Sequence, residues 1–273
     1  MSLATKFRNA TIAQSNEPLT DDAIRAAAPS IFADGKHERR SDRYTYIPTI
    51  EVLNGLRREG FQPFMACQAR PRDRSRTGFA KHMLRLRHES QINSDEANEI
   101  VLVNSHDGTS SYQMLAGVYR FVCNNGMVVG DTVEDLRVPH RGDVVGHVIE
   151  GAYRVLDDFE RVDESRDGMQ AIPLDDQERL AFARAAIDLR WEPGKAPVTA
   201  AQVERPRRLE DSATNLWTTF NVVQEKLVRG GLPGQTRKGK RTRTRPIQGI
   251  DGNVALNRAL WTLAEEMRRI KAA

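Results

Sequence analysis

From about Asp143 onward the apolar residues recur at helical spacing, and this pattern constrains the fold more than any other feature of the chain. Between residues 144 and 159 they form one wide face, which predicts a helix: Val144, Val145, Val148, Ile149, Ala152, Val155, Leu156 and Phe159. Residues 176–189 continue the pattern, and a further helix around 216–227 is stopped by Gly230-Gly231. The last helix repeats apolar residues at spacings of four, three, four and three, as in a helix packed against a partner helix: Leu256, Leu260, Leu263, Met267 and Ile270. We therefore expect an all-helical C-terminal half.

The N-terminal half carries strand patterns as well as helix patterns. Thr20 predicts the N-cap of a short helix that ends near Pro29, and Thr49 is expected to cap a second short helix that Gly60 stops. Apolar residues on either side of a turn-rich stretch predict a β-hairpin over residues 61–88, and residues 100–103 form a third strand.

Residues 111–126 are ambiguous. Asn125-Gly126 is a hairpin turn signal, whereas Leu115, Val118, Tyr119 and Val122 repeat at helical spacing. We favour a helix with Gly126 as its C-cap. The prediction is an α+β fold with a mixed or antiparallel sheet, divided into an N-terminal segment with a short helix (1–40), an α+β domain (41–140) and a helical region (141–273).

Two observations bound the class of protein. No apolar run approaches the roughly 18 residues of a membrane span, and the first residues lack the apolar stretch of a secretion signal, so we expect a cytoplasmic protein. Cys67 and Cys123 are too few for a disulfide scaffold and lack the spacing of a metal or redox site. Both are expected to be small buried apolar residues.

The positive charge of the chain is concentrated in two segments. Residues 68–88 hold seven cations and one acid, and residues 235–246 hold six cations and no acid. Since the whole chain carries +4 and each segment +6, the remainder carries −8. Such an asymmetry indicates a polyanionic partner, for which nucleic acid is the usual candidate.

The first basic segment falls on the predicted 61–88 hairpin. Its arginines occupy alternate positions, which would project from one face of an extended strand and give the sheet a cationic face: Arg70, Arg72, Arg74, Arg76, Lys81, Arg85 and Arg87. Phe79 lies at the expected hairpin tip, where it could stack on a base. The alternative is a solvated edge strand that is protected by its charge.

The second basic segment, residues 235–246, is predicted to be a flexible tether across the end of a helical hairpin. It combines cations with Gly and Thr and contains no aromatic residue, which favours phosphate contact without base reading: Arg237, Lys238, Lys240, Arg241, Arg243 and Arg245. The alternative is a disordered, solvated loop. We expect auxiliary contacts from this segment.

The sequence offers little for catalysis. The histidines lack the spacing of a metal site and are expected at the surface or as caps: His82, His88, His106, His140 and His147. Three carboxylate pairs, 157–158, 163–164 and 175–176, lie where helices carry acids on solvated faces and first turns. No phosphate-binding or dinucleotide-binding loop is present. We expect no catalytic residue, metal or cofactor, with a metal-dependent nuclease as a minor alternative.

Three separated runs carry a family resemblance: YRFVCNNGMVV at 119–129, NLWTTFNVVQEKLVRGG at 215–231, and GID followed by VALNRALWTLA within 249–264. In this order they resemble the phage- and plasmid-like family catalogued as domain of unknown function 932, over roughly residues 40–270. The resemblance implies carriage on a mobile element and no established reaction. The order of a short helix, a basic hairpin, further strands and a packed helix is also similar to that of single-strand annealing recombinases, which lay single-stranded DNA in a cationic groove of rings or filaments.

These observations favour a sequence-nonspecific nucleic-acid-binding protein of a mobile element. We expect it to bind or anneal single-stranded DNA in recombination or in the establishment of plasmid or phage DNA, with duplex DNA and RNA left open. A homo-oligomer, as a ring or filament, follows from that role. The alternative is an anti-defence or regulatory protein that binds and inhibits a host protein.

Overall fold

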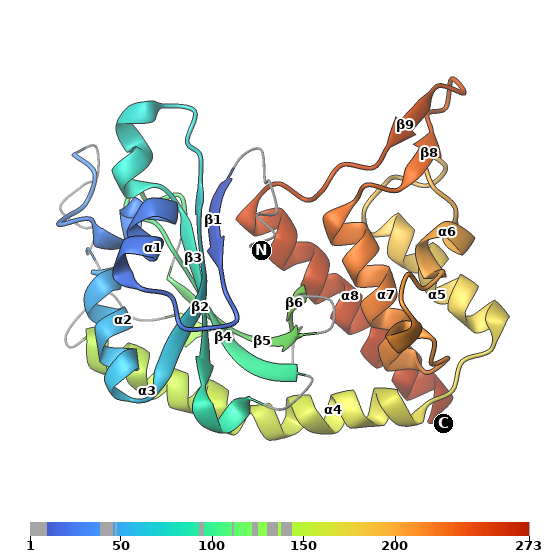
Figure 1. The fold of residues 1–273 in the computed structure, drawn as a ribbon, viewed down its shortest axis with the longest axis horizontal. Helices are drawn as coiled ribbons and strands as arrows, with labels where there is room; N and C mark the ends of the chain where they lie inside the picture. The colour runs from blue at the N-terminus through green and yellow to red at the C-terminus, as the bar shows by residue number, and fades with distance from the viewer. Residues whose placement is uncertain are drawn as a thin grey trace. The chain divides into compact units, whose positions relative to one another are not determined.

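The computed structural model describes residues 10–38, 46, 48–92, 96–110, 112–121, 125–129, 136–137 and 144–272 (Figure 1). The chain divides into two compact units. The first comprises Met1–Phe121, Val133–Phe159 and Gln248–Ile250, and the second comprises Val122–Thr132, Glu160–Ile247 and Asp251–Ala273. The division of the chain at residues 40 and 140 stays a prediction.

An antiparallel sheet forms the centre of the first unit. Five strands follow one another in chain order, and each pairs with the next: β1 (Ala10–Gln14), β2 (Phe61–Ala69), β3 (His82–His88), β4 (Glu96–Asn104) and β5 (Gln113–Arg120). The short strand β7 (Leu136–Arg137) pairs with β5. The predicted hairpin over 61–88 is therefore confirmed as β2 and β3, and the predicted third strand as β4.

The helices of the first unit begin at or next to the residues that the sequence predicts, since Pro48 and not Thr49 is the N-cap of the second one. In α1 (Asp21–Ala27) the Thr20 hydroxyl accepts a hydrogen bond from the Ala23 amide, as expected of an N-cap. The second helix, α2 (Thr49–Arg58), and α3 (Val144–Asp157) bury their apolar faces. Short 3₁₀ turns complete the unit: η1 (Pro29–Phe32), η2 (Arg74–Phe79) and η3 (Glu89–Gln91).

Strands β3, β4 and β5 are buried along most of their length, on both faces of the sheet, and β5 is apolar from Met114 to Tyr119. This burial explains an error of prediction, because residues 113–120 form β5 instead of the favoured helix. A continuous apolar run that is buried on both faces cannot be told from a buried helix by periodicity alone. Gly126 correspondingly lies in the short strand β6 (Asn125–Val128) of the second unit and caps no helix.

The second unit is built mainly of helices. They are α4 (Phe159–Ala171), α5 (Asp176–Asp188), α6 (Ala200–Glu204), α7 (Leu216–Arg229) and α8 (Ile250–Lys271), with a 3₁₀ turn η4 (Leu209–Asp211). Asp175 and Glu178 form a capping box that starts α5. Gly230 ends α7 with φ of 66°. The prediction of an all-helical C-terminal half is wrong in one respect, since a two-stranded hairpin separates α7 from α8.

Aromatic residues join α7 to α8. The Trp261 ring lies 5.9 Å from the Phe220 ring and 6.2 Å from the Trp217 ring, both in edge-to-face geometry. Beside them the Gln224 side chain donates a buried hydrogen bond of 2.6 Å to Asn257. The last helix thus packs against α7 as predicted, but these contacts are made by Trp261 and Asn257 outside the predicted seam, whose last residue, Ile270, is 66% exposed. Among the described residues, no helix is long and apolar enough to cross a membrane.

Candidate nucleic-acid interface

The first basic segment does not form the predicted cationic face. Strand β2 ends at Ala69, so the alternating arginines follow the strand instead of lying on it. Arg74 and Arg76 belong to the 3₁₀ turn η2, where successive side chains point in different directions from those of a strand. Alternation in the sequence therefore places these side chains on no common sheet face.

Arg85 and Arg87 are buried inside the sheet, which corrects their predicted exposure. They are 4% and 2% exposed, and both Nε atoms donate to the buried carboxylate of Glu99 on the neighbouring strand, from Arg87 at 2.8 Å. The Arg87 guanidinium also lies 4.2 Å from the ring centre of Phe64 and 4.0 Å from that of Tyr119. These two cations stabilise the core and are unavailable to phosphates.

The remaining cations of this segment lie on and around η2. Asp73 caps the turn by accepting from the Ser75 amide at 3.0 Å, and its carboxylate lies 3.9 Å from Arg76. Arg72 and Arg74 are exposed and pair with no acid in the described part of the chain. Arg70 is also exposed, and Lys81 is half-buried. Contact of these residues with nucleic acid stays a prediction.

Phe79 is not a free ring at a hairpin tip. It is the last residue of η2, is half-buried, and packs edge-to-face with His37 at 5.3 Å between ring centres. A base would have to share the Phe79 ring with His37, and the stacking role of Phe79 stays a prediction.

The second basic segment forms an ordered hairpin, contrary to the predicted flexible tether. Strands β8 (Pro233–Gln235) and β9 (Arg241–Arg243) pair in antiparallel register, with Gln235 opposite Arg241. The turn is closed by the Thr236 amide, which donates to the Lys240 carbonyl at 2.9 Å, and Gly239 takes the left-handed conformation with φ of 74°. The ladder continues toward the helices, because the Thr244 amide donates to the Leu232 carbonyl at 2.9 Å.

The base of this hairpin is fixed by contacts to distant segments of the second unit. The Gln235 amide donates to the Pro197 carbonyl at 2.9 Å, and a Cβ on Gly234 would lie 2.1 Å from the same oxygen, so only glycine fits there. The Arg190 guanidinium donates to the backbone carbonyls of Leu227 and Arg245, and burial lowers its pKa to about 10. The hairpin is thereby held to α7 and to the loop before α6.

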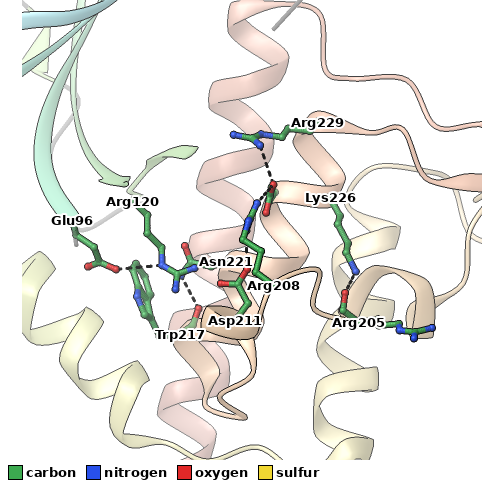
Figure 2. A network of polar contacts seen from close by, with 10 residues as sticks. Glu96, Arg120, Arg205, Arg208, Asp211, Trp217, Asn221, Lys226 and Arg229 are labelled. Atoms are coloured by element: carbon green, nitrogen blue, oxygen red, sulfur yellow. Dashed lines mark hydrogen bonds and ion pairs between the residues drawn. The ribbon is translucent and has the colours of Figure 1, made fainter. Parts of the chain in front are cut away.

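A chain of polar contacts connects α7 to the hairpin through α6. The buried Lys226 ammonium donates to the carbonyls of Gln202, at 2.9 Å, and of Arg205. The Gln202 side chain in turn donates to the Pro233 carbonyl at 3.1 Å. Burial, with a smaller contribution from Arg207, lowers the pKa of Lys226 to about 8. Figure 2 shows Lys226 and the nearby Arg208 and Arg229, which both donate to the carboxylate of Glu225.

The hairpin presents its cations to solvent. In Figure 1 it projects beyond the helices of its unit, with α6 at its base. Residues 233–250 contain no acid and no aromatic residue. Five exposed side chains have no partner among the described residues: Arg237, Lys238, Lys240, Arg241 and Arg245. Arg243 is exposed too and donates to the Gly231 carbonyl at 2.9 Å. We call these six residues the hairpin cations.

A surface pocket of about 770 Å³ lies against the same hairpin. Its wall on one side is Pro197, Thr199 and Gln202, and on the other side it is formed by both strands, including Arg241 and Arg243. Two cations, Arg241 and Arg243, line this pocket, and no aromatic ring on which a base could stack is among its lining residues.

Two buried histidines form a site that sequence reasoning missed. His82 bonds the Ser30 hydroxyl at 2.8 Å and the Thr49 hydroxyl at 2.9 Å, and its ring centre lies 5.1 Å from that of His106. Asn104 donates to the same Thr49 hydroxyl at 3.0 Å. Burial lowers the pKa of His82 to about 3 and that of His106 to about 4, so both are neutral at pH 7.

The expected surface or capping position is therefore wrong for these two histidines, whereas His88 does cap η3 by accepting from the Ser90 amide. His147 is exposed on α3, and His140 lies outside the described residues. No group of three or more His, Cys, Asp or Glu side chains could hold a metal ion within the described ranges. Cys67 is buried as expected, and burial raises the pKa of its thiol to about 12. Cys123 lies outside the described part of the chain.

Comparison with known proteins adds the family. The chain is 53% identical over 265 residues to the UPF0380 protein YfjQ and 52% identical over 265 residues to the UPF0380 protein YafZ, both of Escherichia coli (strain K12). Each alignment covers 97% of this chain and 97% of the relative. No solved structure matches. The family model described as "Domain of unknown function (DUF932)" matches residues 36–261, and the chain therefore belongs to the DUF932 family.

Proposed function

We propose that this protein binds nucleic acid without sequence specificity, through phosphate contacts made by the hairpin cations. The observation that carries the proposal is the concentration of six exposed cations, with no acid, on one anchored hairpin. Side chains that are already free of ion pairs lose no protein contact when they meet a phosphate. Each contact neutralises a phosphate and releases cations that are condensed on the nucleic acid, and this release is the main source of nonspecific affinity.

Order in the hairpin strengthens the proposal. A flexible tether would have to lose conformational entropy before its cations could follow a phosphate backbone. Here the turn is closed by backbone hydrogen bonds and the base is held by Pro197 and Arg190. The principal contacts are therefore assigned to this hairpin, and the 70–76 region is assigned the auxiliary role that the sequence had suggested for residues 235–246.

Roles in single-strand annealing, recombination and the establishment of mobile DNA stay predictions, as does a homo-oligomeric ring or filament. The rival prediction is a protein that binds and inhibits a host protein. Absence of nucleic-acid binding would favour that rival.

The test replaces three hairpin cations that have no partner within the described residues: Arg237→Ala, Lys238→Ala and Arg241→Ala. Arg243 is left in place because it bonds the Gly231 carbonyl. At about 0.5–1 kcal/mol for each phosphate contact, the triple variant should bind a fluorescein-labelled DNA roughly tenfold to a hundredfold more weakly, as measured by anisotropy.

A charge-matched control removes three exposed cations of the same unit that lie outside the hairpin: Arg184→Ala, Arg205→Ala and Arg207→Ala. This control variant should keep its affinity within about threefold, because the removed side chains lie on α5 and just after α6 and do not belong to the hairpin. Equal losses in the two variants would mean that overall charge, and not the hairpin, holds the nucleic acid. No binding by the unaltered protein would refute the function itself.

A further inference from the structure

We infer that the polyanion is B-form duplex DNA and that the β8–β9 hairpin enters its major groove. The inference rests on the proposed function and goes beyond it by naming the form of the nucleic acid. It departs from the single-stranded DNA that the sequence suggested, and the reasons are the dimensions of the hairpin, the placement of its charges and its lack of aromatic residues.

The dimensions of the hairpin suit the major groove. A two-stranded ribbon is a known occupant of this groove, which is about 12 Å wide and 8.5 Å deep, whereas the minor groove is only about 6 Å wide. Because the Pro197 carbonyl holds the Gln235 amide, the free part of the ribbon is its tip, from Thr236 to Lys240. This tip is two strands wide and lies beyond the rung that joins Gln235 to Arg241, so its width suits the major groove better than the minor groove.

The charges lie where a groove-bound ribbon needs them. Arg237, Lys238 and Lys240 occupy the turn, and Arg241 lies on the strand that follows it. A ribbon in the major groove passes between two phosphate backbones, so cations in its turn and along its strand can meet both walls. Thr236 and Gly239 keep the turn narrow, since Gly239 has no side chain and its left-handed φ closes the loop.

A single strand is a poorer match for this hairpin. Proteins that hold single strands combine a cationic groove with aromatic rings on which the bases stack, and each ring contributes substantially to affinity. Residues 233–250 hold no aromatic residue, and none lines the adjoining pocket. Duplex DNA offers a phosphate every 1.7 Å or so along its axis, so cations alone find more partners on a duplex than on a flexible strand.

An RNA duplex is the sharpest comparison, because it carries similar charge in a different shape. Its A-form major groove is deep and too narrow for side chains to read. A hairpin that uses only charge would bind both duplexes equally, whereas a hairpin that must enter the groove would prefer B-form DNA.

The experiment compares four labelled ligands of one length and sequence by fluorescence anisotropy with the full chain. They are a DNA duplex, an RNA duplex, the DNA single strand, and a DNA duplex whose cytosines carry glucosylated hydroxymethyl groups that fill the major groove. We expect the plain DNA duplex to bind at least about tenfold more tightly than each of the other three, because only this ligand has an open B-form major groove. A minor-groove ligand such as distamycin should leave the affinity unchanged.

The hairpin triple variant should lose this preference together with most of its affinity. Equal binding of DNA and RNA duplexes, or full binding of the glucosylated duplex, would overturn the major-groove inference while leaving nucleic-acid binding intact. Tightest binding of the single strand would overturn it in favour of the annealing role. If none of the four ligands binds, it is the proposed function that fails.

Discussion

The buried His82–His106 pair should make the first unit acid-sensitive. Both rings are neutral in the folded chain because burial holds their pKa values at about 3 and about 4, whereas an unfolded histidine titrates near 6.5. Between these limits the unfolded chain binds more protons than the folded chain. Stability is therefore complete above about pH 6.5 and falls as the pH is lowered toward 4.

The size of the loss follows from the same pKa values. A pH of 5 lies about 1.5 units below the pKa of an unfolded histidine, and each unit corresponds to about 1.4 kcal/mol of lost stability per histidine. The two histidines together should lower the free energy of unfolding of this unit by about 4 kcal/mol relative to pH 7.5, which is a large share of the stability of an ordinary domain.

Urea denaturation at pH 7.5 and pH 5.0, followed by far-UV circular dichroism, measures this loss. Tryptophan fluorescence provides an internal comparison, because Trp191, Trp217 and Trp261 all lie in the second unit. Lys226, whose pKa is lowered to about 8, adds little pH dependence to the stability of the second unit in this range. Below pH 7.5 its side chain is mostly protonated in both the folded and the unfolded chain.

Variants assign the effect to the pair. His106→Asn should weaken the fold at pH 7.5 but roughly halve the difference between the two pH values, whereas replacement of the exposed His147 by Asn should change neither. A difference below about 1 kcal/mol in the unaltered protein, or an undiminished difference in His106→Asn, would refute the assignment.

Three further predictions concern the core, the hairpin and assembly. Glu99→Gln leaves two buried guanidinium groups without their carboxylate and should lower the free energy of unfolding, measured in urea, by about 3–5 kcal/mol. Glu150→Gln breaks an exposed pair and should lower it by less than about 1 kcal/mol. Similar losses in the two variants would contradict the role given to burial. Gly234→Ala should displace the hairpin and weaken DNA binding several-fold. Gly249→Ala should leave the affinity unchanged, because a Cβ added there meets no atom within 4 Å. Equal affinities of the two variants would show that the hairpin base tolerates the change. Light scattering should give a multiple of the 30.8 kDa chain mass, and a monomer with and without DNA would contradict the predicted oligomer.

Helices with strong local signals could be predicted from the sequence. Thr20 before α1, the broad apolar face of α3 and Gly230 after α7 each act within a few residues, so their effect is visible in the chain itself. The β2–β3 hairpin was also predictable, because its apolar runs flank a turn-rich stretch.

The fate of Arg85 and Arg87 could not be predicted, because it depends on a residue from another strand. Alternating charged and apolar residues suit a half-exposed strand, yet here Glu99 on β4 supplies the carboxylate that lets both arginines lie inside the sheet. No spacing in the sequence connects Glu99 with them. The same holds for His82, whose partners Ser30 and Thr49 come from η1 and α2.

The ordered hairpin at 233–243 escaped prediction for a similar reason. Its strands are three residues long and have no apolar alternation, so the segment reads as a loop. What orders it is tertiary: the Pro197 carbonyl receives the Gln235 amide, and the Arg190 guanidinium holds the Arg245 carbonyl. The sequence did reveal the concentration of charge, and the structure shows that this charge lies on a paired hairpin whose base is hydrogen-bonded to distant segments.

The salt dependence of DNA binding tests the central claim most directly. Each phosphate neutralised on a duplex contributes about 0.9 to the slope of log affinity against log salt concentration. If Arg237, Lys238 and Arg241 contact phosphates, their joint replacement by Ala should reduce the magnitude of this slope by roughly 2 to 3, while the control variant altered at Arg184, Arg205 and Arg207 keeps the slope of the unaltered protein. A slope near zero in the unaltered protein with binding intact, or the same slope in the hairpin variant, would contradict the claim that this hairpin holds nucleic acid by its phosphates.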